Sequence, residues 1–146
     1  MPKLDFAFLA DAAEANLGRK FYVLGGGIDS IGAQTFPVVH PHMSLVVRLL
    51  LHPTEAGVDH ALDIRLIDSD GGELARVNAS FNARGPFQAG REIAIPIVMN
   101  MTNTRFERAG DYSVEILIDN NHVKSLPLRL QQVSPASPTS EPPPVA

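Results

Sequence analysis

Two histidines are the side chains whose type and spacing most resemble a metal site. His40 and His42 flank Pro41, and imidazoles at positions i and i+2 of a strand point to the same side. Zinc in proteins takes three or four such ligands, and no nearby carboxylate supplies an obvious third. Two interpretations stay open: His40 and His42 as metal ligands or, as we favour, as solvated or hydrogen-bonded histidines of a loop or strand entry imposed by Pro41.

Three glycines, Gly25 to Gly27, follow an apolar run and suggest a phosphate-binding loop. Such a loop continues with Gly-Lys-Ser/Thr, and a dinucleotide-binding loop has glycine at its first, third and sixth positions. No lysine follows here, and the sixth position from Gly25 is Ser30. We interpret the glycines as a bend in a strand, where a side chain would clash with a neighbouring backbone. We therefore predict no binding of ATP, GTP or NAD.

The other candidates for chemistry are less specific. DSDGGE (68–73) begins like a calcium-binding loop, but its twelfth position is Ala79, so we interpret it as a hairpin turn. Ser, His and Asp, the residue types of a catalytic triad, all occur, but the G-x-S-x-G motif around a nucleophilic serine is absent. The chain has no cysteine, so a thiolate nucleophile is excluded. Arg48 and Arg65 lie in strands beside apolar residues. Each is an interior ion-pair member or a binding-face residue, and the default is an exposed side chain with a packed stem. We assign no catalytic residue and no cofactor, and an enzyme is the less favoured class.

Composition limits the partners and the location. The chain has 146 residues, 45% of them apolar, which suits one globular domain. The formal net charge is −4 with only three lysines, so the basic surface that nucleic acids or anionic membranes attract is missing. Asp5 and Asp11 interrupt the N-terminal apolar segment, so it lacks the continuous apolar core that a secretory signal peptide has. We expect a cytoplasmic protein with neither a nucleic acid nor a membrane as partner.

Alternation of apolar and polar residues predicts strands along most of the chain. In KLDFAFL (3–9), Leu4, Phe6 and Phe8 are expected to share a face, and LVVRLLL (45–51) reads as a central strand that is covered on both faces. Further strands are expected in ALDIRLID (61–68), EIAIPIVMNM (92–101), DYSVEILID (111–119) and the leucines at 126, 128 and 130.

Turns and breaks separate these strands. DSDGG (68–72) and DNNH (119–122) are expected to close hairpins, the second with positive φ at Asn120-Asn121. Pro96 and Pro127 each remove a backbone donor, which indicates an edge strand or a bulge. A phase change predicts a bulge near Lys124–Ser125.

Helix is scarce in the sequence. Only residues 11–18 suit a short helix, with Asp11 and Glu14 at capping-box spacing. About eight short strands then predict an all-β fold, an antiparallel β-sandwich of Ig-like or jelly-roll-like type with one short helical turn, over residues 1–133. Residues 134–146 contain five prolines and cannot build a core, so we expect a Pro/Ser-rich flexible tail that is dispensable for folding.

Two stretches resemble a family of bacterial proteins known only as a domain of unknown function. They are FAFLADAAEANLGRKFYVLGGGIDSI (6–31) and RAGDYSVEILIDNNHVKSLPLRL (108–130). The resemblance implies a small β-sandwich and brings no catalytic residues. The step at Gly110-Asp111-Tyr112 resembles a tyrosine corner, in which the phenol ties a turn to a strand.

The favoured function is a non-enzymatic binding or assembly module that binds a protein partner or itself, as a homo-oligomer. Proline-marked edges and a strand as apolar as LVVRLLL suggest sheets that are covered or paired with a neighbour. One alternative is a metal-dependent enzyme or a small-ligand-binding protein that uses His40 and His42. A further alternative is a carbohydrate-binding sandwich, for which Tyr22 and Tyr112 offer few stacking platforms in a chain without tryptophan.

Overall fold

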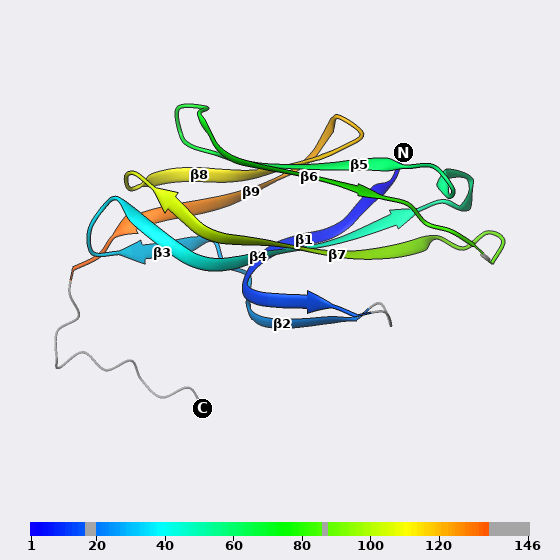
Figure 1. Cartoon of the computed structure of the whole chain (residues 1–146), viewed down its shortest axis with the longest axis horizontal. Coiled ribbons are helices and arrows are strands. Elements are labelled where there is room, and N and C mark those ends of the chain that lie inside the picture. Colours follow the sequence, from blue (N-terminus) through cyan, green and yellow to red (C-terminus); the bar gives the residue numbers. More distant parts are fainter. Residues whose placement is uncertain (17–19, 86–87, 135–146) are drawn as a thin grey trace.

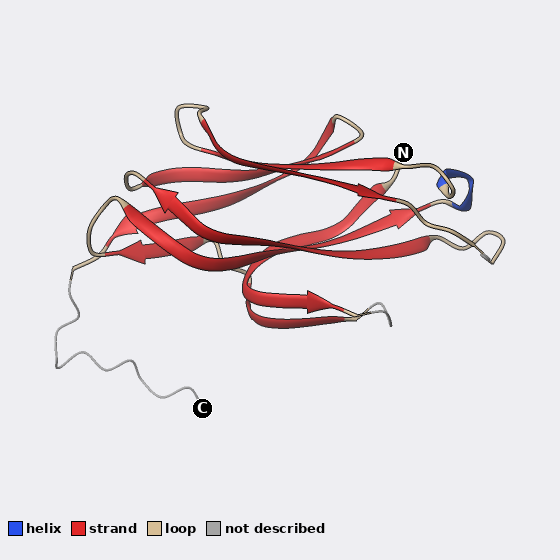
Figure 2. Ribbon diagram, in the orientation of Figure 1, coloured by secondary structure: helices blue, strands red, loops and turns tan. Residues whose placement is uncertain are grey.

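The computed structural model of the chain describes residues 1–16, 20–85 and 88–134. In these ranges the chain forms nine β-strands and one turn of 3-10 helix, η1 (Figures 1 and 2). The elements are β1 (Lys3–Ala15), β2 (Phe21–Gly26), β3 (Ser30–Ala33), β4 (Val38–Leu51), η1 (Pro53–Glu55), β5 (His60–Ile67), β6 (Glu73–Phe81), β7 (Ile93–Phe106), β8 (Gly110–Ile118) and β9 (Asn121–Gln132).

The strands form two sheets that pack face to face. The first sheet has the strand order β2-β1-β4-β7 and the second has the order β3-β9-β8-β5-β6. All pairings between the described strands are antiparallel except that of β3 with β9, which is parallel. The all-β sandwich predicted from the sequence is confirmed, and the parallel pair is a departure from the antiparallel arrangement expected. In Figure 1 the hairpin made by β2 and the end of β1 projects from the rest of the first sheet, at the bottom of the view.

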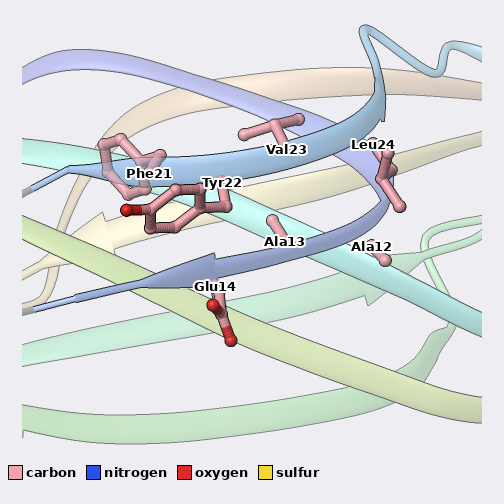
Figure 3. A pocket seen from close by; sticks show the side chains of 7 residues that line it. All are labelled: Ala12, Ala13, Glu14, Phe21, Tyr22, Val23 and Leu24. Carbon is pink, nitrogen blue, oxygen red and sulfur yellow. The ribbon is translucent and has the colours of Figure 1, made fainter.

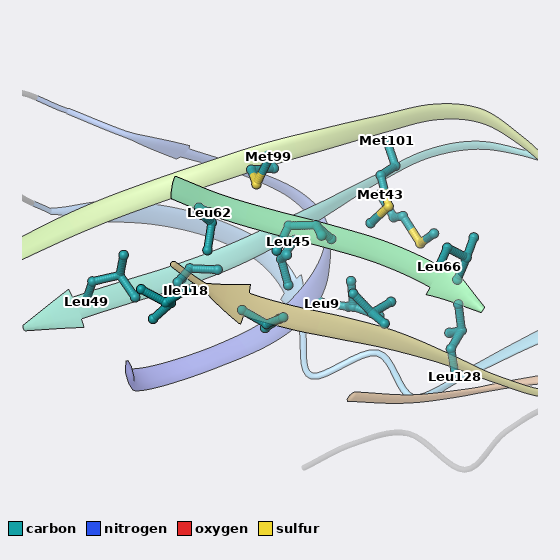
Figure 4. Close-up of a cluster of buried hydrophobic side chains, with 14 of the residues drawn as sticks. Leu9, Met43, Leu45, Leu49, Leu62, Leu66, Met99, Met101, Ile118 and Leu128 are labelled. Carbon is teal, nitrogen blue, oxygen red and sulfur yellow. The ribbon is translucent and has the colours of Figure 1, made fainter. Parts of the chain in front are cut away.

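The hydrophobic core lies between the sheets (Figure 4). Leu45 and Leu49 of β4 belong to one fully buried cluster with Leu62 and Ile118 of the second sheet. β4 also buries Val46, on its other face, so both of its faces are covered. Because β4 lies between β1 and β7, the prediction that LVVRLLL is a central strand is confirmed.

A bulge in β1 changes which side chains face the core. Leu4, Phe6 and Phe8 do not share a face as the alternation predicts, because the register with β4 shifts between Leu4 and Phe6. Asp5 is the extra residue, and it turns the following side chains over. Leu4 and Leu9 therefore pack on the core, while Phe6 and Phe8 stack with ring centroids 6.0 Å apart on the outer face.

The short helix predicted over residues 11–18 is wrong. Residues 11–15 continue β1 and pair with β2, and residues 17–19 lie outside the described residues. Ala10 marks the change of partner, because it pairs with Ser44 of β4 and with Gly26 of β2. Pairing across a hairpin thus overrides the helix propensity of an alanine-rich segment. The helical turn of the structure is η1 instead.

The strand prolines lie where a missing N–H costs little. Pro96 is in β7, which is an edge strand as expected. Pro127 is in β9, whose second neighbour β3 pairs only with residues 129–132. A bulge is present in β9 at Val123, just before the predicted position at Lys124–Ser125. Each proline therefore lies where its strand has one unpaired side, so no neighbouring strand needs the missing N–H on that side.

The predicted hairpin turns are present. In the β5–β6 turn the Asp68 carboxylate accepts hydrogen bonds from the N–H groups of Asp70 and Gly72, at 2.9 and 2.7 Å. In the β8–β9 turn Asp119 and Asn120 have φ of 48° and 65°, one residue earlier than the pair expected. The Asp68 carboxylate thus serves turn geometry, which is the ordinary role of aspartate at such a position, whereas the Asp119 carboxylate accepts from the Ala61 N–H at the start of β5.

The tyrosine corner implied by the family resemblance is present. Tyr112 is only 5% exposed, and its hydroxyl donates a hydrogen bond of 2.7 Å to the carbonyl oxygen of Arg108. Its ring meets that of Phe106 edge to face, with centroids 5.1 Å apart. The phenol therefore ties the turn before β8 to the core.

The end of β9 is the last part of the chain that the structure describes. The N–H of Val133 donates to the carbonyl oxygen of Ala33, at 2.9 Å. Most of the predicted tail, residues 135–146, lies outside the described residues. That the tail is dispensable for folding stays a prediction.

Candidate functional site

His40 and His42 lie inside β4, opposite Thr104 and Thr102 of β7. They share the outer face of the first sheet, as the i, i+2 spacing predicts, although the strand and not a loop carries them. The Nε2 atom of His42 lies 3.3 Å from the Ser44 hydroxyl. The Nε2 atom of His40 is buried without a hydrogen-bond partner. Among the described residues no group of three His, Cys, Asp or Glu side chains is placed to hold a metal ion.

We expect the purified protein to hold no stoichiometric zinc, because two imidazoles are fewer ligands than zinc takes in proteins. Elemental analysis of the protein and of a His40→Ala/His42→Ala variant tests this, with His122→Ala as the matched control. The double variant should keep the fold and the oligomeric state. Stoichiometric zinc that the double variant loses and the control retains would establish His40 and His42 as metal ligands.

The three glycines form a bend, as predicted. Gly25 and Gly27 have φ of 61° and 89°, a region that favours glycine. A Cβ atom on Gly25 would lie 2.0 Å from a carboxylate oxygen of Asp11, so the obstacle is a side chain rather than the expected backbone. The N–H groups of Gly27 and Ile28 donate to the carbonyl oxygen of Leu9, at 2.8 and 2.9 Å. These amides are therefore already paired and do not form a cradle for phosphate.

A serine, a histidine and a carboxylate meet on the outer face of the second sheet. The Nε2 atom of His122 lies 2.6 Å from a carboxylate oxygen of Glu115 and 3.0 Å from the Ser125 hydroxyl. A catalytic triad uses both ring nitrogens, one for the serine and one for the acid, whereas here both partners meet the same nitrogen. The Ser125 hydroxyl also donates to Glu115. The cluster therefore links β8 to β9 and does not have the geometry of a catalytic triad.

Electrostatics at Glu115 agree with this structural role. Burial raises the pKa of the Glu115 carboxyl, but hydrogen bonds from Ser125, His122 and Ser113 outweigh burial and hold the pKa below its ordinary value. Sequence reasoning missed the cluster, because Glu115 and Ser125 are ten residues apart in the sequence. They come together only through the strand register, in which Glu115 lies opposite Ser125. The hairpin turn predicted at 119–122 could have indicated the cluster, because it pairs the strands that carry Glu115 and Ser125.

The strand arginines are occupied by ion pairs. Arg65 and Arg76 both contact Asp63, with N···O distances of 2.8 and 2.9 Å, and Arg48 contacts Asp5 at 2.7 Å. Burial raises the pKa of Asp63, which is 7% exposed, but hydrogen bonds from Arg76 and Arg65 and their charges lower it below its ordinary value. Arg48 and Arg65 are therefore ion-pair members, but their side chains are 40% and 31% exposed rather than interior, which is closer to the default expected from the sequence.

The hairpin strands, residues 10–15 of β1 and 21–26 of β2, carry apolar side chains on an exposed face. Tyr22 and Leu24 are 55% and 71% exposed and lie on one face with Ala12 and Glu14. Together with Ala13, Phe21 and Val23 (Figure 3) they line an open hollow of about 570 Å³ on the hairpin. We call this surface, lined by Ala12, Ala13, Glu14 and residues 21–24, the hairpin surface.

Hydrogen bonds and an aromatic contact hold the hairpin surface in place. Near the tip, the Asn16 amide donates to the Tyr22 hydroxyl at 3.2 Å, and its oxygen accepts from the Lys20 N–H at the same distance. At the same end of the hairpin, the Phe21 ring, opposite Ala15, packs edge to face on Phe6, with centroids 5.8 Å apart. The exposed side chains therefore sit on an ordered hairpin rather than on a loose loop.

Comparisons with known proteins identify the family and the fold. Residues 5–131 match the model of a family described as "Family of unknown function (DUF6941)", which confirms the resemblance found at the two ends of the chain. No curated protein matches this chain. The crystal structure of the C-terminal domain of wzt is similar with a TM-score of 0.50 and 11% identity, over 91% of this chain and 75% of that chain. Similarity at that identity shows the sandwich fold alone.

A second solved structure is more distant. It is the Pseudomonas fluorescens alkylpurine DNA glycosylase AlkC bound to DNA containing an abasic site analog, with a TM-score of 0.44 and 14% identity. The match covers 89% of this chain and 30% of that chain, and at that TM-score it carries no argument.

In the described part of the chain, no helix has the length and apolar character that a membrane span needs.

Proposed function

This chain belongs to the family of unknown function DUF6941, and we propose that it is a non-enzymatic module that self-assembles through the hairpin surface. The observation that carries the proposal is the exposure of Tyr22 and Leu24 together on one face of an ordered hairpin. Single exposed apolar residues are normal on any protein. A contiguous apolar patch on an element outside the core is typical of an interaction site.

The hairpin gains stability from a partner more than the sandwich does. A two-stranded hairpin is marginally stable in water by itself, and this one contacts the sandwich through Phe21 on Phe6. Covering Leu24 and Tyr22 removes further apolar surface from water, which is favourable by about 25 cal/mol for each Å² buried. The proposal includes the cytoplasmic location expected from the sequence.

The alternative functions have less support among the described residues. A metal-dependent enzyme would use His40 and His42, and the neighbours of these side chains are Thr102, Thr104 and Ser44 rather than carboxylates. A carbohydrate-binding sandwich needs exposed aromatic platforms. Of the two tyrosines, Tyr112 is buried in the core and holds the corner before β8.

We expect the wild-type protein to be larger than a monomer, and Leu24→Glu to weaken its association about tenfold, because a carboxylate would be desolvated at the contact. Sedimentation velocity or light scattering over a wide range of protein concentration measures both. The matched control is Val77→Glu, at a valine of β6 that is 38% exposed, which should leave association unchanged. A wild-type monomer at every concentration would contradict the proposal, as would dissociation caused by the control alone.

A further inference from the structure

The four edge strands of the sandwich differ in how open they are to a further strand. β3 has only four residues. β6 carries Glu73 and Arg76, and β7 carries Pro96 and Arg105. Short length, charges and proline are the features by which edges resist the addition of a strand. β2, Phe21–Gly26, has neither charge nor proline, so it is the edge that accepts another strand most readily.

We propose that β2 pairs antiparallel with β2 of a second copy of this chain, with Val23 opposite Val23 on a two-fold axis. This inference rests on the proposed function and names its partner and geometry. The two hairpins then form one sheet with the order β1-β2-β2-β1. Neighbouring strands of such a sheet lie about 4.8 Å apart and exchange the backbone hydrogen bonds that an open edge leaves unmade.

The sequence of β2 is complementary to itself in this register. With Val23 on the axis, Tyr22 lies opposite Leu24 of the second copy, so both exposed side chains gain an apolar cross-strand neighbour. Phe21 lies opposite Gly25, and the aromatic ring can cover a position that has no side chain. In this register the large Phe21 meets the small Gly25, and the two exposed apolar side chains meet each other.

Other registers are less favourable. Centring the pair on Tyr22 brings Lys20 opposite Leu24, which places a charge against an apolar side chain at the contact. Centring it between Tyr22 and Val23 puts the exposed Tyr22 and Leu24 of one copy on the opposite face of the joint sheet from those of the other copy. In the proposed register Lys20 lies opposite Gly26, at the margin, and no two charged residues of the edge meet across the axis.

The geometry also sets the number of copies. A two-fold contact uses the same edge of both chains, so it closes after two copies and leaves no β2 edge for a third. The bend at Gly25, with φ of 61°, ends the regular strand and limits the pairing to about five residues. The product is therefore a closed dimer rather than a fibre.

An introduced cysteine tests the register, because the chain has no cysteine of its own. In Val23→Cys the two thiols would meet on the axis, where Cα atoms of opposite residues in an antiparallel pair are about 4.5 to 5.5 Å apart, within disulfide range. We expect mild oxidation to convert most of this variant into a disulfide-linked dimer on a non-reducing gel. Val77→Cys, on the β6 edge, is the matched control and should stay monomeric on the gel.

A second pair of variants tests the same register if Val23→Cys does not fold. Tyr22→Cys and Leu24→Cys should crosslink to each other when mixed, and neither should crosslink to itself. Assembly in solution without these crosslinks would overturn the pairing of β2 and leave the hairpin surface as the contact. A monomer in solution would overturn both proposals. Crosslinking of Val77→Cys in place of Val23→Cys would move the contact to β6 and overturn both as well.

Discussion

Val47→Ala lowers the free energy of unfolding by about 2 to 3 kcal/mol and the melting temperature by about 8 °C. Val47 lies in β4 and is fully buried in the core between the sheets. The smaller side chain loses its transfer free energy and leaves a cavity, since tightly paired strands on both sides of β4 hinder collapse around it.

The matched control for Val47→Ala is Val39→Ala, in the same strand. Val39 is 50% exposed, so its truncation should change stability by less than about 0.5 kcal/mol. Chemical denaturation at one fixed protein concentration measures both variants. Equal losses at Val47 and Val39 would mean that the burial assigned to β4 is wrong.

Removing His60 costs about 2 kcal/mol at mildly acidic pH and less at alkaline pH. Its ring lies 2.8 Å from the Asp119 carboxylate through Nδ1 and 2.9 Å from the Glu55 carbonyl oxygen through Nε2. Both partners accept hydrogen bonds, so the doubly protonated, charged ring satisfies both at once. His60 thereby joins the turn before β5 to the β8–β9 hairpin.

The pH dependence follows from two pKa shifts. Burial lowers the pKa of His60, but its hydrogen bonds to Glu55 and Asp119 and their charges outweigh burial and raise it above 6.5. The stabilisation is thus complete below pH 6.5 and is lost as the pH rises through the raised value. Burial raises the pKa of Asp119, but hydrogen bonds from Ala61 and His60 lower it below 3.8, so its stabilisation is lost only as the pH falls through that lower value.

Urea denaturation of the wild type and His60→Ala, from about pH 5 to about pH 9, measures this difference. Asp119→Asn is the matched variant, because asparagine tolerates the φ of 48° at this position and carries no charge. It should remove the part of the pH dependence that comes from Asp119, keep the part that comes from Glu55, and leave the turn intact. A stability difference between wild type and His60→Ala that does not change with pH would show that the ring is neutral in the folded protein.

Most strands and both hairpin turns were predictable, because the apolar alternation has period two over long runs. Tyr112, Val114, Ile116 and Ile118 all face the core for this reason. The alternation does not predict a bulge, in which one extra residue shifts the register. Asp5 shifts the register of β1, and the outer positions of Phe6 and Phe8 could not be read from the spacing alone.

The candidate surface was harder to predict than the fold. Residues 11–15 are rich in alanine and carry capping signals, so local propensity favours a helix there. Their pairing with β2 depends on a turn and on a partner strand that local propensity does not register. The uncharged run Phe21–Gly26 was the available signal, since an exposed edge normally carries a charge.

The parallel pairing of β3 with β9 has a consequence for how fast the chain folds. The β5–β6 and β8–β9 hairpins join residues that are close in the sequence, whereas the side chain of Gln132 reaches the carbonyl oxygen of Gln34, a separation of 98 residues. Contacts between distant residues form only after a large loss of chain entropy, which slows folding. The two hairpins can therefore form early, and the edge that joins β3 to the end of β9 closes late.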